Sequence, residues 1–273
     1  MVNVNRQDVE PRFRRRRIKR VNLSQLTRIS FLPSVFTTLN LFFGFTALLH
    51  ILKGNFLVAT FWITASVIMD GFDGTIARLT KTESNFGVQL DSLSDAVAFG
   101  LVPAVLIYYW GFANAHSQVG KLVAFSFLAA GVIRLARFNV FKEAKAVPSS
   151  IFIGFPIPGG ALAISSVVLL FTSPPPRTDW EFALYSLFCL AISFLMISNV
   201  KYRTAKKILN KQSLAPLMLL ALVVASMVLY PGVAIPILTS IYLLSPIGFA
   251  LYFRLKRKPE AAAATTPVPP PRT

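Results

Sequence analysis

The sequence predicts an all-α, polytopic integral membrane protein with about eight transmembrane helices, and three observations carry this prediction. Of the 273 residues, 54% are hydrophobic and only 14% are charged, whereas a soluble domain is about 25% charged. The apolar residues gather in blocks near the length of roughly 20 residues that a helix needs to cross a bilayer. Most blocks lack the alternation of apolar and polar residues that marks a transmembrane barrel strand. This composition argues against a soluble globular enzyme.

The apolar blocks are separated by short polar stretches, and Gly and Pro often stand at their ends, where they mark helix boundaries or kinks in a membrane. We expect helices over about 34–52, 56–79, 92–112, 121–140, 155–172, 181–198, 214–230 and 232–253. The corresponding organisation is a basic tail over 1–30, a membrane domain over 31–205, two additional helices over 206–255 and a disordered tail over 256–273.

The basic residues indicate how the chain is oriented. With eight spans, 25 of the 28 Lys and Arg residues fall on the side of the N-terminus, and only Lys53, Lys121 and Arg177 fall on the other. Because cytoplasmic loops carry the excess of Lys and Arg, we expect both termini to face the cytoplasm, in a bacterial-type cytoplasmic membrane. The net charge of +17 therefore indicates contact with lipid headgroups, and no nucleic-acid partner is expected.

Five of the 11 acidic residues fall within 26 positions around the second and third blocks. Asp70 and Asp73 are three residues apart, and Asp91 and Asp95 are four apart, so each pair lies on one face of a helix. A carboxylate in a bilayer helix costs several kcal/mol or so unless it is paired, metal-bound or hydrated. Both pairs lie close to the cytoplasmic edge of adjacent antiparallel helices, so we expect all four carboxylates to converge there.

Four carboxylates together would repel one another without a cation. Mg²⁺ and Mn²⁺ prefer oxygen ligands and commonly bridge to phosphates, so the sequence predicts a divalent metal site. Small residues at Gly74, Ala77 and Gly87 allow close helix packing or the approach of a ligand to the backbone, and Arg78 is placed to contact a phosphate.

Two further arginines, Arg134 and Arg137, stand three residues apart at the cytoplasmic end of the fourth block, near Asn139. Guanidinium groups in an apolar helix need an anionic partner. A lipid phosphate and an amino-acid carboxylate are both candidates.

Read together, Asp70-Gly-Phe-Asp73-Gly74-Thr-Ile-Ala77-Arg78, then Gly87, Asp91 and Asp95 at fixed spacing, resemble the signature of the CDP-alcohol phosphatidyltransferase superfamily. Flanking segments, Pro33–Asn40, Arg134–Asn139 and Gly154–Pro158, are similar to the phosphatidylserine synthase branch. The resemblance covers roughly residues 30 to 205. It implies a helical membrane enzyme, often a homodimer, that transfers a phosphatidyl group from CDP-diacylglycerol to L-serine and releases CMP.

The resemblance also implies roles for particular residues. Asp70, Asp73 and Asp91 would be metal ligands, and Asp95 would be both a metal neighbour and the general base. The residues expected around the nucleotide and diphosphate are Ser34, Thr37, Gly74, Arg78 and Ser84.

Two alternatives remain open from the sequence. A sister transferase could use glycerol 3-phosphate or inositol phosphate as acceptor, since Arg134 and Arg137 could bind the dianionic phosphate of either. A divalent-cation transporter would also place aspartates in the membrane, but its site is expected near the midplane between internal repeats, and the aspartate motif occurs once.

Overall fold

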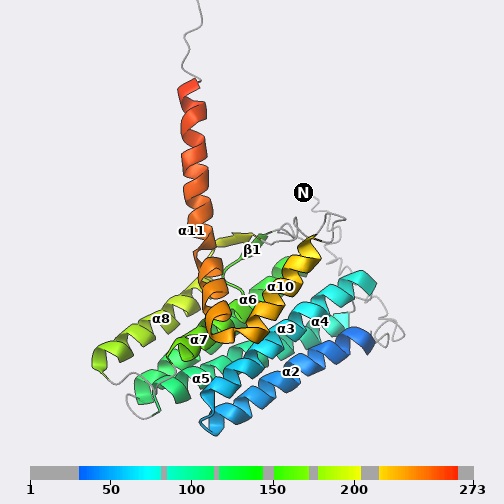
Figure 1. The fold of residues 1–273 in the computed structure, drawn as a ribbon, viewed down its shortest axis with the longest axis vertical. Helices are drawn as coiled ribbons and strands as arrows, with labels where there is room; N and C mark the ends of the chain where they lie inside the picture. Colours follow the sequence, from blue (N-terminus) through cyan, green and yellow to red (C-terminus); the bar gives the residue numbers. More distant parts are fainter. Residues whose placement is uncertain are drawn as a thin grey trace, which may run out of the picture.

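The computed structural model describes residues 31–80, 85–113, 117–143, 151–171, 178–203 and 215–263, and all structural statements below concern these residues. Most of the helices run side by side in a bundle, and the last one projects away from it (Figure 1), so the predicted all-α class is confirmed. In chain order the helices are α2 (Phe31–Leu52), α3 (Phe56–Thr80), α4 (Asn85–Asp95), the π-helical η1 (Ala96–Leu101), α5 (Val102–Gly111), α6 (Ser117–Glu143), α7 (Ile157–Leu170), α8 (Asp179–Ile197), α10 (Ala215–Leu229) and α11 (Pro231–Ala263).

Each predicted block coincides with a helix, with α4, η1 and α5 forming one continuous rod. Four stretches are long and apolar enough to cross a membrane: Ser34–Leu52, Phe86–Gly111, Ser117–Phe141 and Asp179–Ile197. Three apolar stretches are shorter: Phe56–Phe72, Ile157–Leu170 and Pro231–Pro246. The count of eight spans therefore stays a prediction.

The last helix, α11, continues to Ala263, into the segment that the sequence predicts to be a disordered tail. Alanine is the strongest helix former, and three alanines complete this helix.

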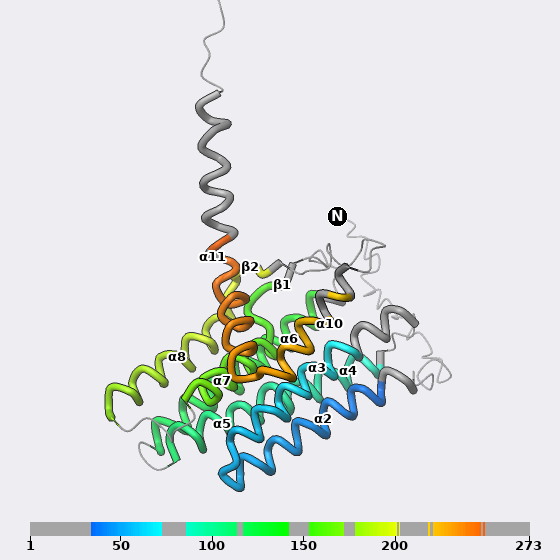
Figure 2. Tube along the Cα trace, in the orientation of Figure 1, coloured from blue at the N-terminus to red at the C-terminus, as the bar shows by residue number. Residues whose placement is uncertain are grey.

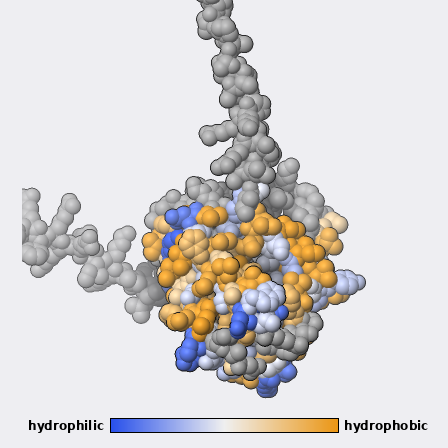
Figure 3. Space-filling model, turned by 90° about the vertical axis from the view of Figure 1, so that its left-hand side faces the viewer, coloured by the Kyte–Doolittle hydropathy of each residue, from blue (hydrophilic) through white to orange (hydrophobic). Residues whose placement is uncertain are grey.

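Large apolar areas cover the face of the bundle that Figure 3 shows, as expected for helices that face lipid. On α6, the side chains of Leu122 and Phe125 are 70% and 65% exposed, whereas Phe127 is fully buried. Phe194 on α8 is 71% exposed. Soluble monomers rarely expose apolar patches larger than about 300–600 Å², so these side chains indicate a membrane environment.

A short antiparallel ribbon joins two distant parts of the chain. Strand β1 (Ile151–Ile153) pairs with β2 (Lys201–Arg203), with Phe152 opposite Tyr202. The sequence analysis did not predict these strands, because three residues are too few to show an alternating pattern.

The two C-terminal helices meet at the bundle, where α10 lies next to the lower part of α11 (Figure 2). Helix α11 packs against α7 and reaches β2, and α10 packs against α11. This places the last helix beside the ribbon.

Candidate metal and acceptor site

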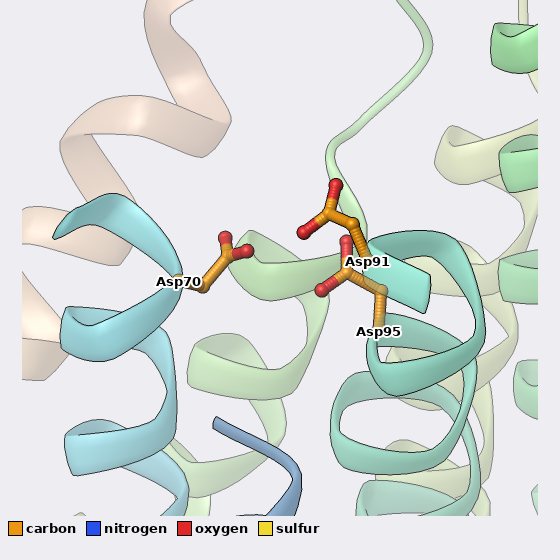
Figure 4. A group of neighbouring side chains, drawn as sticks. All are labelled: Asp70, Asp91 and Asp95. Carbon is orange, nitrogen blue, oxygen red and sulfur yellow. The ribbon is translucent and has the colours of Figure 1, made fainter. Parts of the chain in front are cut away.

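Three of the four predicted aspartates come together between α3 and α4. Asp70 extends from α3 toward Asp91 and Asp95 on α4 (Figure 4), and each residue offers an oxygen within 4.8 Å of the others. Two oxygens bound to one ion lie at most about 4.2 Å apart for Mg²⁺ and at most about 5 Å apart for Ca²⁺. The cluster therefore has the donor chemistry of a divalent-cation site, and small side-chain rotations would bring its oxygens to the spacing that Mg²⁺ requires.

The fourth aspartate, Asp73, belongs to α3, but its side chain lies outside the part that the structure describes. The same holds for the side chains of Ala77 and Arg78 and for the surroundings of Gly74 on this helix. Ser84 lies outside the described residues altogether.

Asp95 is the most enclosed of the three clustered aspartates, with a side chain 8% exposed, while Asp70 and Asp91 are half-buried. The Asn40 side-chain amide on α2 donates to Asp95 Oδ1 at 3.4 Å. The Ser66 hydroxyl on α3 in turn donates to the Asn40 side-chain oxygen. This second hydrogen bond orients the amide so that its N–H groups face the carboxylate.

Close packing of two helices brings Asn40 to Asp95. One turn along α2 from Asn40, Gly44 faces Ala98 of η1, and a Cβ on Gly44 would lie 2.8 Å from the Ala98 Cβ. The π-helical turns begin directly after Asp95. Such turns widen a helix locally and are frequent at functional sites.

Arg134 on α6 is the buried cation next to the cluster. Its side chain is 6% exposed, and its guanidinium interacts electrostatically with the carboxylates of Asp95 and Asp70. The guanidinium also lies 5.9 Å from the ring centroid of Phe138. The buried Arg134 Nε has no hydrogen-bond partner among the described residues.

Arg137 is arranged differently from Arg134. Its Nη1 donates to the carbonyl of Ile197 at 2.7 Å, and its Nη2 donates to the carbonyl of Ser198 at 3.1 Å. The last carbonyls of a helix have no partner within that helix, and Arg137 satisfies those at the end of α8. Arg137, which the sequence analysis predicts to bind substrate, thus donates these hydrogen bonds to the protein backbone.

The other predicted substrate residues lie on three helices. On α2, Ser34 is half-buried and Thr37 is buried, and Gly87 is half-buried on α4. The Asn139 side-chain amide on α6 donates to the Ser92 hydroxyl at 2.9 Å, which ties α6 to the helix that carries Asp91 and Asp95.

Two residues at the site were missed by the sequence analysis as site residues. The sequence could have indicated Asn40, since a lone amide inside an apolar block needs a hydrogen-bond partner. Nothing in the sequence marks Ser66 as a site residue, because a serine in a transmembrane helix commonly donates a hydrogen bond to the backbone of its own helix.

The family model of the CDP-alcohol phosphatidyltransferases matches residues 30–197. A CDP-diacylglycerol–serine O-phosphatidyltransferase of Helicobacter pylori is 33% identical over 82% of this chain and 92% of its own length. One from Methanocaldococcus jannaschii is 38% identical over 58% of this chain and 67% of its own length. An archaetidylserine synthase of Methanothermobacter thermautotrophicus is 33% identical over 67% of this chain and 73% of its own length.

Proposed function

Because the chain belongs to the CDP-alcohol phosphatidyltransferase family, we propose that it transfers the phosphatidyl group of CDP-diacylglycerol to the hydroxyl of L-serine and releases CMP. The cluster of Asp70, Asp91 and Asp95 carries the proposal, since it supplies a cation site for a diphosphate substrate. The names of relatives that match most of the chain support serine as the acceptor.

Asp70, Asp73, Asp91 and Asp95 would hold the divalent metal, Mg²⁺ or Mn²⁺. Such an ion, when bound, neutralises charge on phosphoryl oxygens and on the departing phosphate. Three carboxylates within 4.8 Å of one another repel each other strongly in a low-dielectric setting, and a cation removes that repulsion.

Asp95 is the proposed general base. A serine hydroxyl is a weak nucleophile at neutral pH, so a carboxylate within hydrogen-bond reach must accept its proton as it attacks phosphorus. Asn40 and Ser66 act as positioning residues, because they hold the Asp95 carboxylate in one orientation. The reaction is a direct in-line displacement, and a trapped phosphatidyl–enzyme adduct would contradict it.

The donor lipid is proposed to lie along α2, α3 and α4. Small residues let its nucleotide and diphosphate approach the backbone, and polar residues contact them. The proposed donor-binding residues are Ser34, Thr37, Gly74, Ala77, Arg78, Ser84 and Gly87.

The proposed setting is the cytoplasmic membrane, with the active site and both termini on the cytoplasmic side and a homodimer as the assembled form. The distribution of Lys and Arg along the sequence supports this orientation. A bilayer also provides the lipid donor directly to the exposed apolar surface.

An acceptor panel tests the proposed function. Purified protein receives CDP-diacylglycerol and Mn²⁺ or Mg²⁺, together with L-serine, glycerol 3-phosphate or inositol phosphate, and CMP release is measured. We expect release with serine well above the rate with water, the appearance of phosphatidylserine, and loss of both in excess EDTA. Release with either phosphorylated acceptor but not with serine would assign a sister reaction.

A further inference from the structure

Two tyrosines from beyond the family match lie near the buried arginine: Tyr242 interacts electrostatically with Arg134, and Tyr202 lies next to Tyr242. Tyr202 is on β2 and Tyr242 is on α11, whereas the family model ends at residue 197. Their ring centroids are 5.4 Å apart, and each ring also lies within 6 Å of the Phe155 ring, at 5.5 Å and 5.7 Å. The last helix thus contributes a side chain next to the ribbon and close to α6.

Two buried polar groups in this region have no hydrogen-bond partner among the described residues. Tyr202 is 1% exposed, and its hydroxyl, like Arg134 Nε, is buried without a hydrogen-bond partner in the described parts of the chain. The Tyr242 hydroxyl lies close enough to the Arg134 guanidinium to interact electrostatically. Leaving a buried donor unpaired costs about 1–3 kcal/mol, and more for a charged group. Because Tyr242 interacts electrostatically with both Arg134 and Tyr202, the two unpartnered groups lie on either side of one phenol and point to a ligand that pairs with them.

The three side chains are all able to donate hydrogen bonds. A guanidinium carries five N–H donors and no acceptor, and a phenol donates through its O–H. Burial raises the pKa of the Tyr202 hydroxyl above its ordinary value, so this group keeps its proton at neutral pH. Neighbouring donors of this kind, with Tyr242 between Arg134 and Tyr202, suit an anion that accepts from several sides.

We propose that Arg134, Tyr202 and Tyr242 bind the carboxylate of the amino-acid acceptor, and that Tyr242 makes α11 a determinant of acceptor specificity. The proposal rests on the proposed function. Arg134 interacts with Asp95, so a carboxylate held at Arg134 places the rest of a small acceptor on the side of Asp95.

The charge of the site favours a carboxylate over a phosphate ester. Arg134 supplies one positive charge, and the two phenols are neutral donors, which matches a monoanion. The neighbouring Arg137 donates to five protein oxygens, four of them backbone carbonyls, so a second guanidinium is not directed to the same ligand.

The test compares L-serine with L-serinamide, which keeps the hydroxyl and the amine but lacks the carboxylate. In the wild-type protein, kcat/KM is expected to favour serine. Tyr242→Phe keeps the ring in the aromatic cluster and removes only the hydroxyl. We expect the KM for serine to rise about tenfold or more, as for loss of a hydrogen bond to a charged group, with kcat and the KM for CDP-diacylglycerol unchanged. The preference for serine over serinamide should shrink by the same factor.

Tyr202→Phe provides a second variant with the same expected shift. Tyr230→Phe is the matched control, because Tyr230 immediately precedes α11 and is 71% exposed, and it should leave both constants unchanged. A variant that only destabilises the fold should lower turnover equally with serine and with serinamide, so the ratio of the two kcat/KM values would stay the same.

The outcomes separate the two proposals. If the wild-type protein uses serine but both phenylalanine variants keep its KM and its preference over serinamide, the carboxylate assignment is wrong and the proposed function stands. A change in the KM for CDP-diacylglycerol alone would place these residues at the donor and also overturn the assignment. If the wild-type protein uses only phosphorylated acceptors, both proposals fail.

Discussion

Asp95 differs from Asp70 and Asp91 in its surroundings. It is the buried member of the cluster, it accepts a hydrogen bond from Asn40, and it interacts electrostatically with Arg134. Asp70 and Asp91 are more exposed. Identical side chains can therefore take different roles, and the proposed function gives Asp95 the proton transfer in addition to its share of the metal site.

At this scale we predict that Asp95→Asn abolishes nearly all turnover. The amide keeps the size of the carboxylate but cannot accept the proton of the acceptor hydroxyl, so CMP release should fall about 10²–10⁴-fold. Because Asp70, Asp73 and Asp91 would still hold the metal, binding of CDP-diacylglycerol, measured by equilibrium binding with labelled lipid, should persist within a few fold of wild type.

Asp179→Asn is the matched control for this substitution. Asp179 lies in the first turn of α8, apart from the clustered aspartates, so its loss should leave CMP release near the wild-type rate. Full activity of Asp95→Asn would remove Asp95 from the role of base.

At the scale of the elements, the site depends on how closely two helices cross. Gly44 on α2 and Ala98 on η1 are in contact one turn from the Asn40–Asp95 hydrogen bond. Small residues at such crossings allow helix backbones to approach in membranes. The α2–η1 crossing therefore holds Asn40 within reach of Asp95.

We predict that Gly44→Ala destabilises the protein, although alanine is the better helix former by about 1 kcal/mol. Its Cβ would lie 2.8 Å from the Ala98 Cβ and 2.9 Å from the Ala98 Cα, and overpacking typically costs about 1–3 kcal/mol. The thermal unfolding midpoint and CMP release should both fall.

Gly232→Ala is the control, because a Cβ at Gly232 meets nothing within 4 Å. It should leave the unfolding midpoint and the turnover unchanged. Equal behaviour of the two variants would mean that α2 and η1 are not in close contact.

Arg137 also connects the β1–β2 ribbon to the end of α8. Arg137 reaches from α6 to the carbonyls of Ile197 and Ser198, and Gly154, with φ of 79°, leaves room beside it. A Cβ on Gly154 would lie 2.8 Å from Arg137 Nη2 and 2.3 Å from the Met196 carbonyl oxygen. Arg137 thus stabilises the junction that also positions Tyr202.

At the scale of the whole molecule, the charge pattern predicts one orientation in the membrane. Of the 28 Lys and Arg residues, 25 fall on the side of the N-terminus in the eight-span arrangement. The Lys53–Asn55 turn between α2 and α3 would then lie on the opposite side.

Cysteine labelling tests this orientation in a Cys189→Ala background, which removes the single native cysteine. With a membrane-impermeant maleimide, Asn55→Cys should react in cells whose cytoplasmic membrane is intact and whose outer envelope is permeabilised. Asn5→Cys, in the basic N-terminal segment, should react only after the cytoplasmic membrane is opened. The reverse pattern would contradict the predicted topology.

The sequence by itself determined the all-α membrane class and the pairing of aspartates on two helix faces, because helical periodicity and apolar length are local properties of the chain. Only the tertiary structure distinguished Arg134, whose Nε has no partner in the described part of the chain, from Arg137, which donates to backbone carbonyls. It alone joined Asn40 to Asp95, 55 positions away, and brought Tyr202 and Tyr242 together. Contacts between residues so far apart depend on which helices pack against each other, and no local pattern encodes that choice.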